Sequence, residues 1–169
     1  RWYQRHSRTF LREFYKRKPI ILYANDADFH QTNAINGSLG EGTGGVTESL
    51  KERVIMPLTG SYKDTDHVLG HELVHSFQYD IALSKTDSMR FAFEFVPLWM
   101  TEGMAEYFSV GRFDPHTAMW MRDAALRDDL PTIEKITKDM SYFPYRYGQA
   151  YLAYIGGKYG DSAVANLFK

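Results

Sequence analysis

Two histidines and a glutamate within five residues are the clearest chemical pattern in the chain. His71, Glu72 and His75 occur as His-Glu-Leu-Val-His, an HExxH pattern. In a helix, side chains four residues apart lie one turn apart and about 40° around the axis, so both imidazoles can reach one metal ion at about 2.0–2.1 Å. Glu72 projects beside them, where it can take a proton from an activated water molecule. The pattern predicts a zinc site with an adjacent general base.

Two histidines do not make a secure zinc site, so a third ligand is expected. Glu102 follows His75 by 27 residues, and Glu106 follows Glu102 by four, which places both carboxylates on one face of an otherwise apolar helix. Buried unpaired carboxylates are costly, and a divalent cation is a sufficient partner. We predict Glu102 as the third ligand. The alternative is a pair of exposed acids on a surface helix. Gly103 and Ala105 are small and would let this helix pack closely against the HExxH helix.

The hydrophobic pattern predicts the elements that position these residues. Asp64, Thr65 or Asp66 can cap the HExxH helix, which is expected to run to about Leu83. Other helices are expected at 1–18, 97–110, 115–127, 131–138, 147–158 and from 161 onward, and strands at 20–24, 46–48 and 53–58. The strand at 20–24 is expected to be buried. The order predicts an α+β domain in which a small mixed sheet precedes a mainly helical part.

Two features before the HExxH helix concern the surroundings of the site. Pro57 indicates that the strand at 53–58 lies at a sheet edge or ends there. Residues 37–45 hold five glycines. The Lys-Ser/Thr order of a phosphate-binding loop does not follow them, so the glycines more readily indicate a sharp bend or a close approach of the backbone to another group.

Composition limits the classes of protein to which the chain can belong. Its 169 residues fit one domain, 44% of them are hydrophobic, and 20 basic against 21 acidic residues give a net charge of −1. This balance gives no overall preference for nucleic acid. Disulfides, thiolate metal sites and cysteine nucleophiles are excluded because the chain has no cysteine. No apolar run approaches the ~18 residues of a transmembrane segment.

The N-terminal segment is rich in basic residues, and both ends of the chain bear on whether it is a fragment. Seven of the basic residues lie within residues 1–18, against one acid, and their spacing of three to four residues predicts a basic outer helix face. That face is either solvated or docked onto an acidic neighbouring domain. The chain begins at Arg1 and stops at Lys169 inside a predicted helix. We therefore expect a fragment of a longer protein.

The HELVH and WMTEGMAEY segments together resemble the gluzincin zinc metallopeptidases, a group that includes thermolysin and aminopeptidases of the aminopeptidase-N type. The resemblance implies that His71, His75 and Glu102 bind zinc and that Glu72 is the general base. Glu106 stands at the offset of an acid that orients a zinc histidine in thermolysin. The gap between HELVH and Glu102 is longer here than in those two relatives.

A closer similarity is to the peptidase-MA-like domains of bacterial proteins that carry a C-terminal Tol-type β-propeller. The similar blocks are GEGTGGVTESLKERVIMPL, DTDHVLGHELVHSFQYD, LWMTEGMAEYF and RYGQAYLAYIGGKYG, which together cover most of the chain. This resemblance implies a zincin-like fold, a propeller downstream in the full-length protein and an extracytoplasmic location.

Gluzincins commonly stabilise the oxyanion with a tyrosine or histidine from a later helix. By that resemblance Tyr147 is the first choice and Tyr151 the reserve, with a packing role as the alternative for either. Arg146 is expected to form a surface ion pair, with a substrate carbonyl or carboxylate as its alternative partner. His67 lies one turn before His71 and shares its face. A fourth zinc ligand there would close the position that catalysis needs, so the alternatives for His67 are a place in the cleft, in contact with substrate, or no role at the site.

The predicted function is zinc-dependent hydrolysis of peptide bonds, with a peptide or protein as the partner. In gluzincins the edge strand before the zinc helix binds the substrate backbone as an added strand, and the strand at 53–58 is assigned that place by resemblance. The alternative function is a non-catalytic, zinc-stabilised recognition domain attached to a propeller. Hydrolysis of a non-peptide amide is a third possibility.

Overall fold

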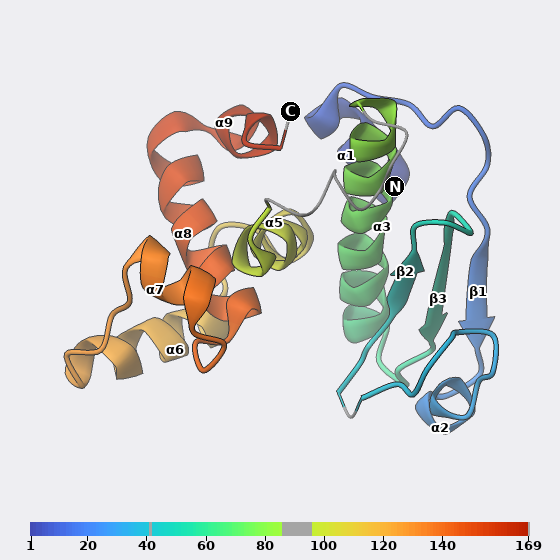
Figure 1. Cartoon of the computed structure of the whole chain (residues 1–169), viewed down its shortest axis with the longest axis horizontal. Coiled ribbons are helices and arrows are strands. Elements are labelled where there is room, and N and C mark those ends of the chain that lie inside the picture. The colour runs from blue at the N-terminus through green and yellow to red at the C-terminus, as the bar shows by residue number, and fades with distance from the viewer. Residues whose placement is uncertain (41, 86–95, 169) are drawn as a thin grey trace.

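The fold combines a small sheet with a larger set of helices, which confirms the α+β class predicted from the sequence (Figure 1). The structure is a computed structural model that describes residues 1–40, 42–85 and 96–168. In chain order its elements are α1 (Trp2–Phe10), β1 (Ile20–Tyr23), α2 (Asp26–His30), β2 (Val46–Glu48), β3 (Arg53–Pro57), α3 (Tyr62–Lys85), α5 (Leu98–Val110), α6 (Pro115–Leu126), α7 (Ile133–Lys138), α8 (Pro144–Tyr159) and α9 (Asp161–Asn166).

The sheet has three strands in the order β1-β3-β2. β1 runs parallel to β3 and β2 runs antiparallel to it. Pro57 ends β3 as predicted, but β3 is the central strand, so the expectation that it forms the edge beside the zinc helix was wrong. β1 is not buried either, since Ile20 and Leu22 are exposed. Its apolar composition reflects an edge strand with one covered face.

The helix with the HExxH pattern, α3, lies beside β2 and β3 and connects the sheet to the helical part of the molecule (Figure 1). It is 24 residues long and begins slightly before the predicted caps, where Ser61 Oγ accepts a hydrogen bond from the backbone N–H of Asp64 at 3.3 Å. Val74 and Phe77 are fully buried on its apolar side. The polar side carries the histidines of the pattern.

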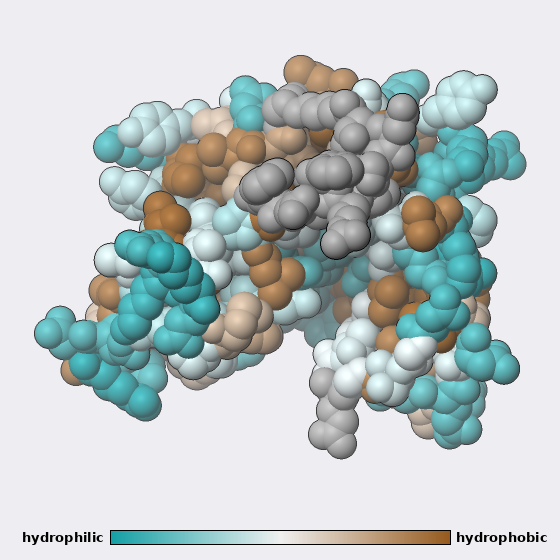
Figure 2. Space-filling view, viewed as in Figure 1, coloured by the Kyte–Doolittle hydropathy of each residue, from teal (hydrophilic) through white to brown (hydrophobic). Residues whose placement is uncertain are grey.

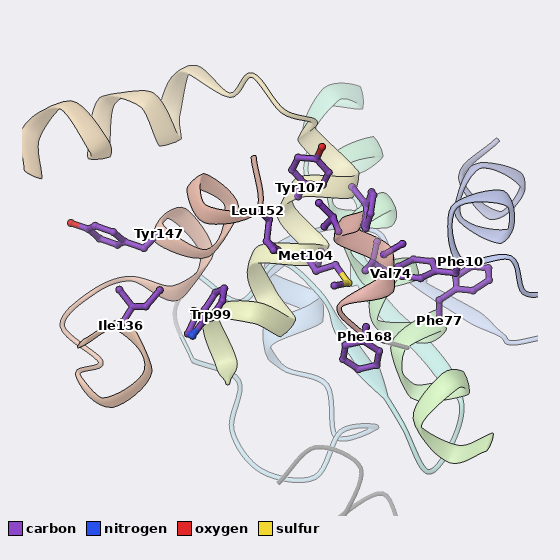
Figure 3. Close-up of a cluster of buried hydrophobic side chains, with 14 of the residues drawn as sticks. Phe10, Val74, Phe77, Trp99, Met104, Tyr107, Ile136, Tyr147, Leu152 and Phe168 are labelled. Atoms are coloured by element: carbon purple, nitrogen blue, oxygen red, sulfur yellow. The ribbon is translucent and has the colours of Figure 1, made fainter. Parts of the chain in front are cut away.

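A close crossing of two helices fixes α5 in the helical part. A Cβ atom placed on Gly103 of α5 would lie 2.4 Å from the carbonyl carbon of Gly148 in α8. Gly103 therefore serves the packing of α5 on α8, and the expectation that it serves the contact with the HExxH helix was wrong. Figure 3 shows side chains of the buried hydrophobic cluster, to which α1, α3, α5, α6, α7, α8, α9 and Phe168 contribute.

The starts of α6 and α7 follow from side-chain caps. Asp114 accepts a hydrogen bond from the N–H of Thr117 at 2.7 Å and Thr132 accepts one from that of Lys135 at 3.2 Å, so α6 and α7 begin close to the predicted positions. In the part of the chain that the structure describes, no helix has the length and apolar character needed to cross a membrane.

The N-terminal helix is shorter than predicted. α1 ends at Phe10 because Leu11 adopts a left-handed conformation with φ 52°. The basic segment that follows binds acids of the same chain: Arg12 pairs with Asp80 of α3, and Lys18 lies 3.3 Å from both Asp80 and Glu52. These ion pairs account for part of the basic character of residues 1–18.

Candidate metal centre

Three predicted ligands meet between α3 and α5. The Nε2 atoms of His71 and His75 are 3.1 Å apart, and Glu102 Oε2 lies 3.2 Å from each of them. Both imidazoles are buried, and the side chain of Glu102 is 14% exposed. The structure thus brings together His71, His75 and Glu102, and it excludes the alternative of exposed acids on a surface helix.

The outer nitrogens of both imidazoles are occupied by acceptors. His71 Nδ1 lies 2.9 Å from Glu106 Oε1, and His75 Nδ1 lies 2.8 Å from Gln78 Oε1. If each Nδ1 carries the proton and donates it to its partner, each Nε2 presents a lone pair to the other and to Glu102. In that tautomer three electron-rich atoms face one another, and a cation between them would balance their mutual repulsion.

The donor set fits zinc. Two imidazole nitrogens and one carboxylate oxygen are a known catalytic zinc set that leaves a further coordination position open. Ligand atoms about 2.0–2.1 Å from a tetrahedral ion are separated by about 3.3 Å, close to the 3.1 and 3.2 Å found here. The hydrogen bonds to Glu106 and Gln78 fix the imidazoles in the orientation that metal binding needs.

The pKa values of His71 and Glu102 are both shifted in the direction that favours a positive charge on the imidazole beside a negative carboxylate. Burial by itself would lower the pKa of His71, but hydrogen bonds to Glu102 and Glu106 outweigh burial and raise it to about 10. Burial would raise the pKa of Glu102, but the charge of His75 and hydrogen bonds to both imidazoles hold it well below its usual range. Either protons on the imidazoles or a cation can balance the carboxylates.

Glu106 connects the cluster to an ion-pair network. Its Oε2 lies 3.0 Å from Nη1 of Arg146, which lies 3.1 Å from Asp114, the residue that caps α6. Nε2 of His67 is 3.3 Å from Glu106 Oε1. Glu106 therefore occupies the orienting position that the sequence predicted, and Arg146 belongs to this network rather than to a surface ion pair.

Glu72 lies next to the ligands with its carboxylate under the glycine-rich segment. It is 5% exposed, and a Cβ atom placed on Gly45 would lie 2.9 Å from both its Cγ and its Oε1. At this glycine the backbone approaches another group closely, which is one of the two roles predicted for the segment. Only a residue without a side chain leaves the carboxylate this space.

A cavity of about 520 Å³ opens beside His71 and Glu72, where Figure 2 shows the surface hollowed between the helical part and the sheet part. Such a volume lies within the range of small-molecule and peptide side-chain pockets. Its walls are the glycine-rich segment, the first half of α3, and the start of α8. His67 lines it, which selects one of the two alternatives that the sequence left open for this residue.

The tyrosine predicted at the site is not there. Tyr147 packs its ring against Trp120 and Tyr142, and Figure 3 shows its hydroxyl pointing away from Val74 of α3. The reserve candidate, Tyr151, donates its hydroxyl to the carbonyl of Pro131 at 3.0 Å. Both tyrosines serve packing, and neither lines the cavity.

Tyr145 lies beside the candidate ligands, in the position that the resemblance implied for Tyr147. Its ring stacks on His71 with centroids 5.7 Å apart, and it lines the cavity. Burial, together with the charge of Glu102 and a hydrogen bond to it, raises the pKa of Tyr145, so that the hydroxyl keeps its proton. α8 begins at Pro144, three residues before the predicted start, which turns residue 145 toward α3 and residue 147 away from it.

Two further residues of the site were missed in the sequence. Gln78 follows His75 by three residues, a spacing that places the two side chains on one helix face and could have indicated their contact. Thr47 reaches Glu72 from β2, and no local pattern connects residues 25 positions apart.

The chain was compared with known proteins. No protein-family model, curated protein or solved structure matches it.

Proposed function

We propose that the protein is a zinc-dependent hydrolase of peptide bonds with a zincin-like fold of the gluzincin type. The main support for this proposal is that His71 Nε2, His75 Nε2 and Glu102 Oε2 lie within 3.2 Å of one another. The other nitrogen of each imidazole is already hydrogen-bonded. The HELVH and WMTEGMAEY segments, which resemble those of gluzincins, support the same class.

In this proposal His71, His75 and Glu102 hold the ion, and zinc supplies Lewis acidity toward water and the substrate carbonyl. Glu72 accepts a proton from the attacking water and passes it to the leaving amine nitrogen. Tyr145 donates its hydroxyl to the carbonyl oxygen as that atom gains negative charge. A tyrosine hydroxyl keeps its proton at neutral pH, so Tyr145 is available as a donor there.

The cavity supports a peptide as the substrate. Val68, Phe143 and Tyr145 give it apolar walls for a side chain, while Arg146 provides a hydrogen-bond donor for a backbone carbonyl. Among the described strands, β2 pairs only with β3, so its outer edge is placed to receive an extended substrate strand. We assign to β2 the place that the resemblance to gluzincins implied for the strand at 53–58.

The resemblance to propeller-bearing bacterial proteins extends the proposal to the whole molecule. We propose a downstream Tol-type β-propeller and an extracytoplasmic location on that ground alone. A non-catalytic recognition domain would use the same zinc ligands, so metal content cannot separate the two functions. The buried carboxylate of Glu72 next to the ligands favours catalysis, since a purely structural ion needs no base beside it.

The test is the variant Glu72→Gln, assayed on a library of quenched fluorescent peptides with zinc content measured by mass spectrometry. We expect hydrolysis to fall by at least ~100-fold, because general-base catalysis contributes about 10²–10⁴-fold. Zinc should remain stoichiometric, since Glu72 is not a ligand. Undiminished hydrolysis by a clean preparation of this variant would refute Glu72 as the base, and an inactive zinc-loaded wild type would favour the recognition domain.

A further inference from the structure

A threonine of the sheet holds the carboxylate of Glu72. Thr47 Oγ1 lies 2.6 Å from Glu72 Oε2 and 2.9 Å from the backbone carbonyl oxygen of the same residue. A hydroxyl has one proton to donate, and its shorter contact is to a carboxylate, the stronger acceptor. Oε2 of Glu72 is therefore engaged by the hydroxyl of Thr47.

The place of Thr47 in the sheet fixes its hydroxyl. Thr47 lies opposite Val54 of the central strand, and side chains alternate along β2, so Thr47 faces α3 while its neighbours face the other way. The neighbour Glu48 is tied to Lys51 at 2.9 Å and to Arg53 at 2.5 Å. Because threonine is branched at Cβ, its side chain has few rotamers, and the hydroxyl cannot easily turn away.

The other oxygen of Glu72 is limited by Gly45. A Cβ atom there would lie 2.9 Å from Oε1, so the backbone of the segment stands against this oxygen without covering it with a side chain. The two residues come from one short stretch of chain, Gly45 to Thr47. Together they confine the carboxylate from one side and leave Oε1 as the oxygen without this hydrogen bond.

We propose that Thr47 is a positioning residue for Glu72. By donating to Oε2, it holds the carboxylate so that Oε1 exchanges the proton with water and the leaving amine. This inference rests on the proposed function of Glu72 as the general base. It also gives the edge strand β2 a direct influence on the base, because a displacement of the strand displaces the hydroxyl.

The test compares Thr47→Val, which has nearly the same shape without the hydroxyl, with Thr47→Ser, which keeps it. In the zinc-loaded protein, Thr47→Val should lower kcat by about 10- to 100-fold, the usual loss when a group that orients a site is removed. KM and zinc content should stay within about twofold, as Thr47 contacts neither ligand nor cavity. Thr47→Ser should restore kcat to within about threefold, the cost of a less restricted rotamer.

The matched control is Ser76→Ala. Ser76 Oγ donates to the backbone carbonyl of Glu72 at 3.3 Å and does not reach its carboxylate. Losing this buried hydroxyl should leave kcat unchanged. Unchanged kcat in Thr47→Val, or a parallel loss of zinc and kcat, overturns the positioning role.

Crystal structures of the metal-free Thr47→Val and Thr47→Ser variants give a readout independent of activity. The carboxylate of Glu72 should leave its position in Thr47→Val and keep it in Thr47→Ser. An unmoved carboxylate in Thr47→Val overturns the inference. If the wild type hydrolyses no peptide, the proposed function fails, and these two structures still decide whether Thr47 positions Glu72.

Discussion

Glu106 joins one proposed ligand, His71, to the surrounding helices. One of its oxygens accepts from His71 at 2.9 Å, and the other faces Arg146 at 3.0 Å. Burial would raise the pKa of Glu106, but hydrogen bonds to His67 and His71 hold it well below its usual range. A carboxylate in this state keeps its charge and makes the imidazole of His71 a more basic ligand.

Replacing Glu106 by Gln tests this role at the scale of a single residue. The amide oxygen can still accept from His71, but the charge is lost, and we expect zinc affinity to fall by about 10- to 100-fold. Competition with a fluorescent chelator measures the change. Glu134→Gln is the control, since Glu134 is an exposed acid of α7 that pairs with Lys138. Equal affinities for wild type and Glu106→Gln would contradict the orienting role.

At the scale of elements, local chemistry made most helices predictable. Asp114 and Thr132 cap α6 and α7 with side-chain hydrogen bonds, and these signals depend only on residues three positions apart. The convergence of the three candidate ligands was predictable for a related reason. HExxH fixes its geometry within one helical turn, and the pair Glu102 and Glu106 repeats that spacing on α5.

Local sequence patterns did not predict the features of the fold that depend on contacts between residues far apart in the chain. Leu11 breaks the N-terminal helix, and Arg12 and Lys18 then bind Asp80 of α3, more than sixty positions away. The order of the strands likewise depends on pairing that alternation does not encode. Tyr145 was missed because the start of α8, and hence the face it turns to α3, is set by tertiary packing.

The crossing of α5 and α8 carries a prediction about stability. A Cβ atom on Gly148 would lie 2.0 Å from the carbonyl oxygen of Trp99, a backbone atom that cannot move without shifting α5. Gly148→Ala should therefore lower the free energy of unfolding by about 1–3 kcal/mol or more. Urea denaturation measures it.

Gly157, also in α8, is the matched control for this substitution. Its nearest neighbour beyond the helix is Arg112 Cδ at 4.0 Å from the added Cβ, so Gly157→Ala should gain up to about 1 kcal/mol from helix propensity. If both alanine variants were equally stable, the crossing would not depend on close backbone contact.

The same crossing bears on the candidate site. Gly103, which packs against α8 there, directly follows Glu102, so the crossing also helps to set the position of the Glu102 carboxylate.

At the scale of the whole molecule, α3 joins the sheet to the helical part. It contacts the sheet on one side, α5 on another, and α1 on a third (Figure 1). One contact between α1 and α3 is made by His6, whose Nε2 lies 3.0 Å from the carbonyl oxygen of Gly70, the residue before His71. A buried histidine outside the candidate site therefore contributes to the packing of these two helices.

Burial lowers the pKa of His6 from 6.5 to about 4, although its hydrogen bond to Gly70 opposes the shift. In the described part of the chain, its Nδ1 has no hydrogen-bond partner, so an added proton there would be unpaired. Between these two pKa values the unfolded chain binds a proton that the folded protein does not. The contribution of His6 to the free energy of unfolding is therefore fully present above pH ~6.5. It decreases toward pH ~4, by up to about 3 kcal/mol.

The variant His6→Gln isolates this contribution, because glutamine can donate to Gly70 but does not titrate. We expect its free energy of unfolding to fall less than that of the wild type between pH 7 and pH 4, with the two curves converging toward the acid end. Denaturant titrations in excess chelator measure both curves, and the chelator keeps the metal site identical in the two proteins. Other titrating groups cancel in the comparison, so parallel curves would mean that His6 takes up its proton as easily folded as unfolded.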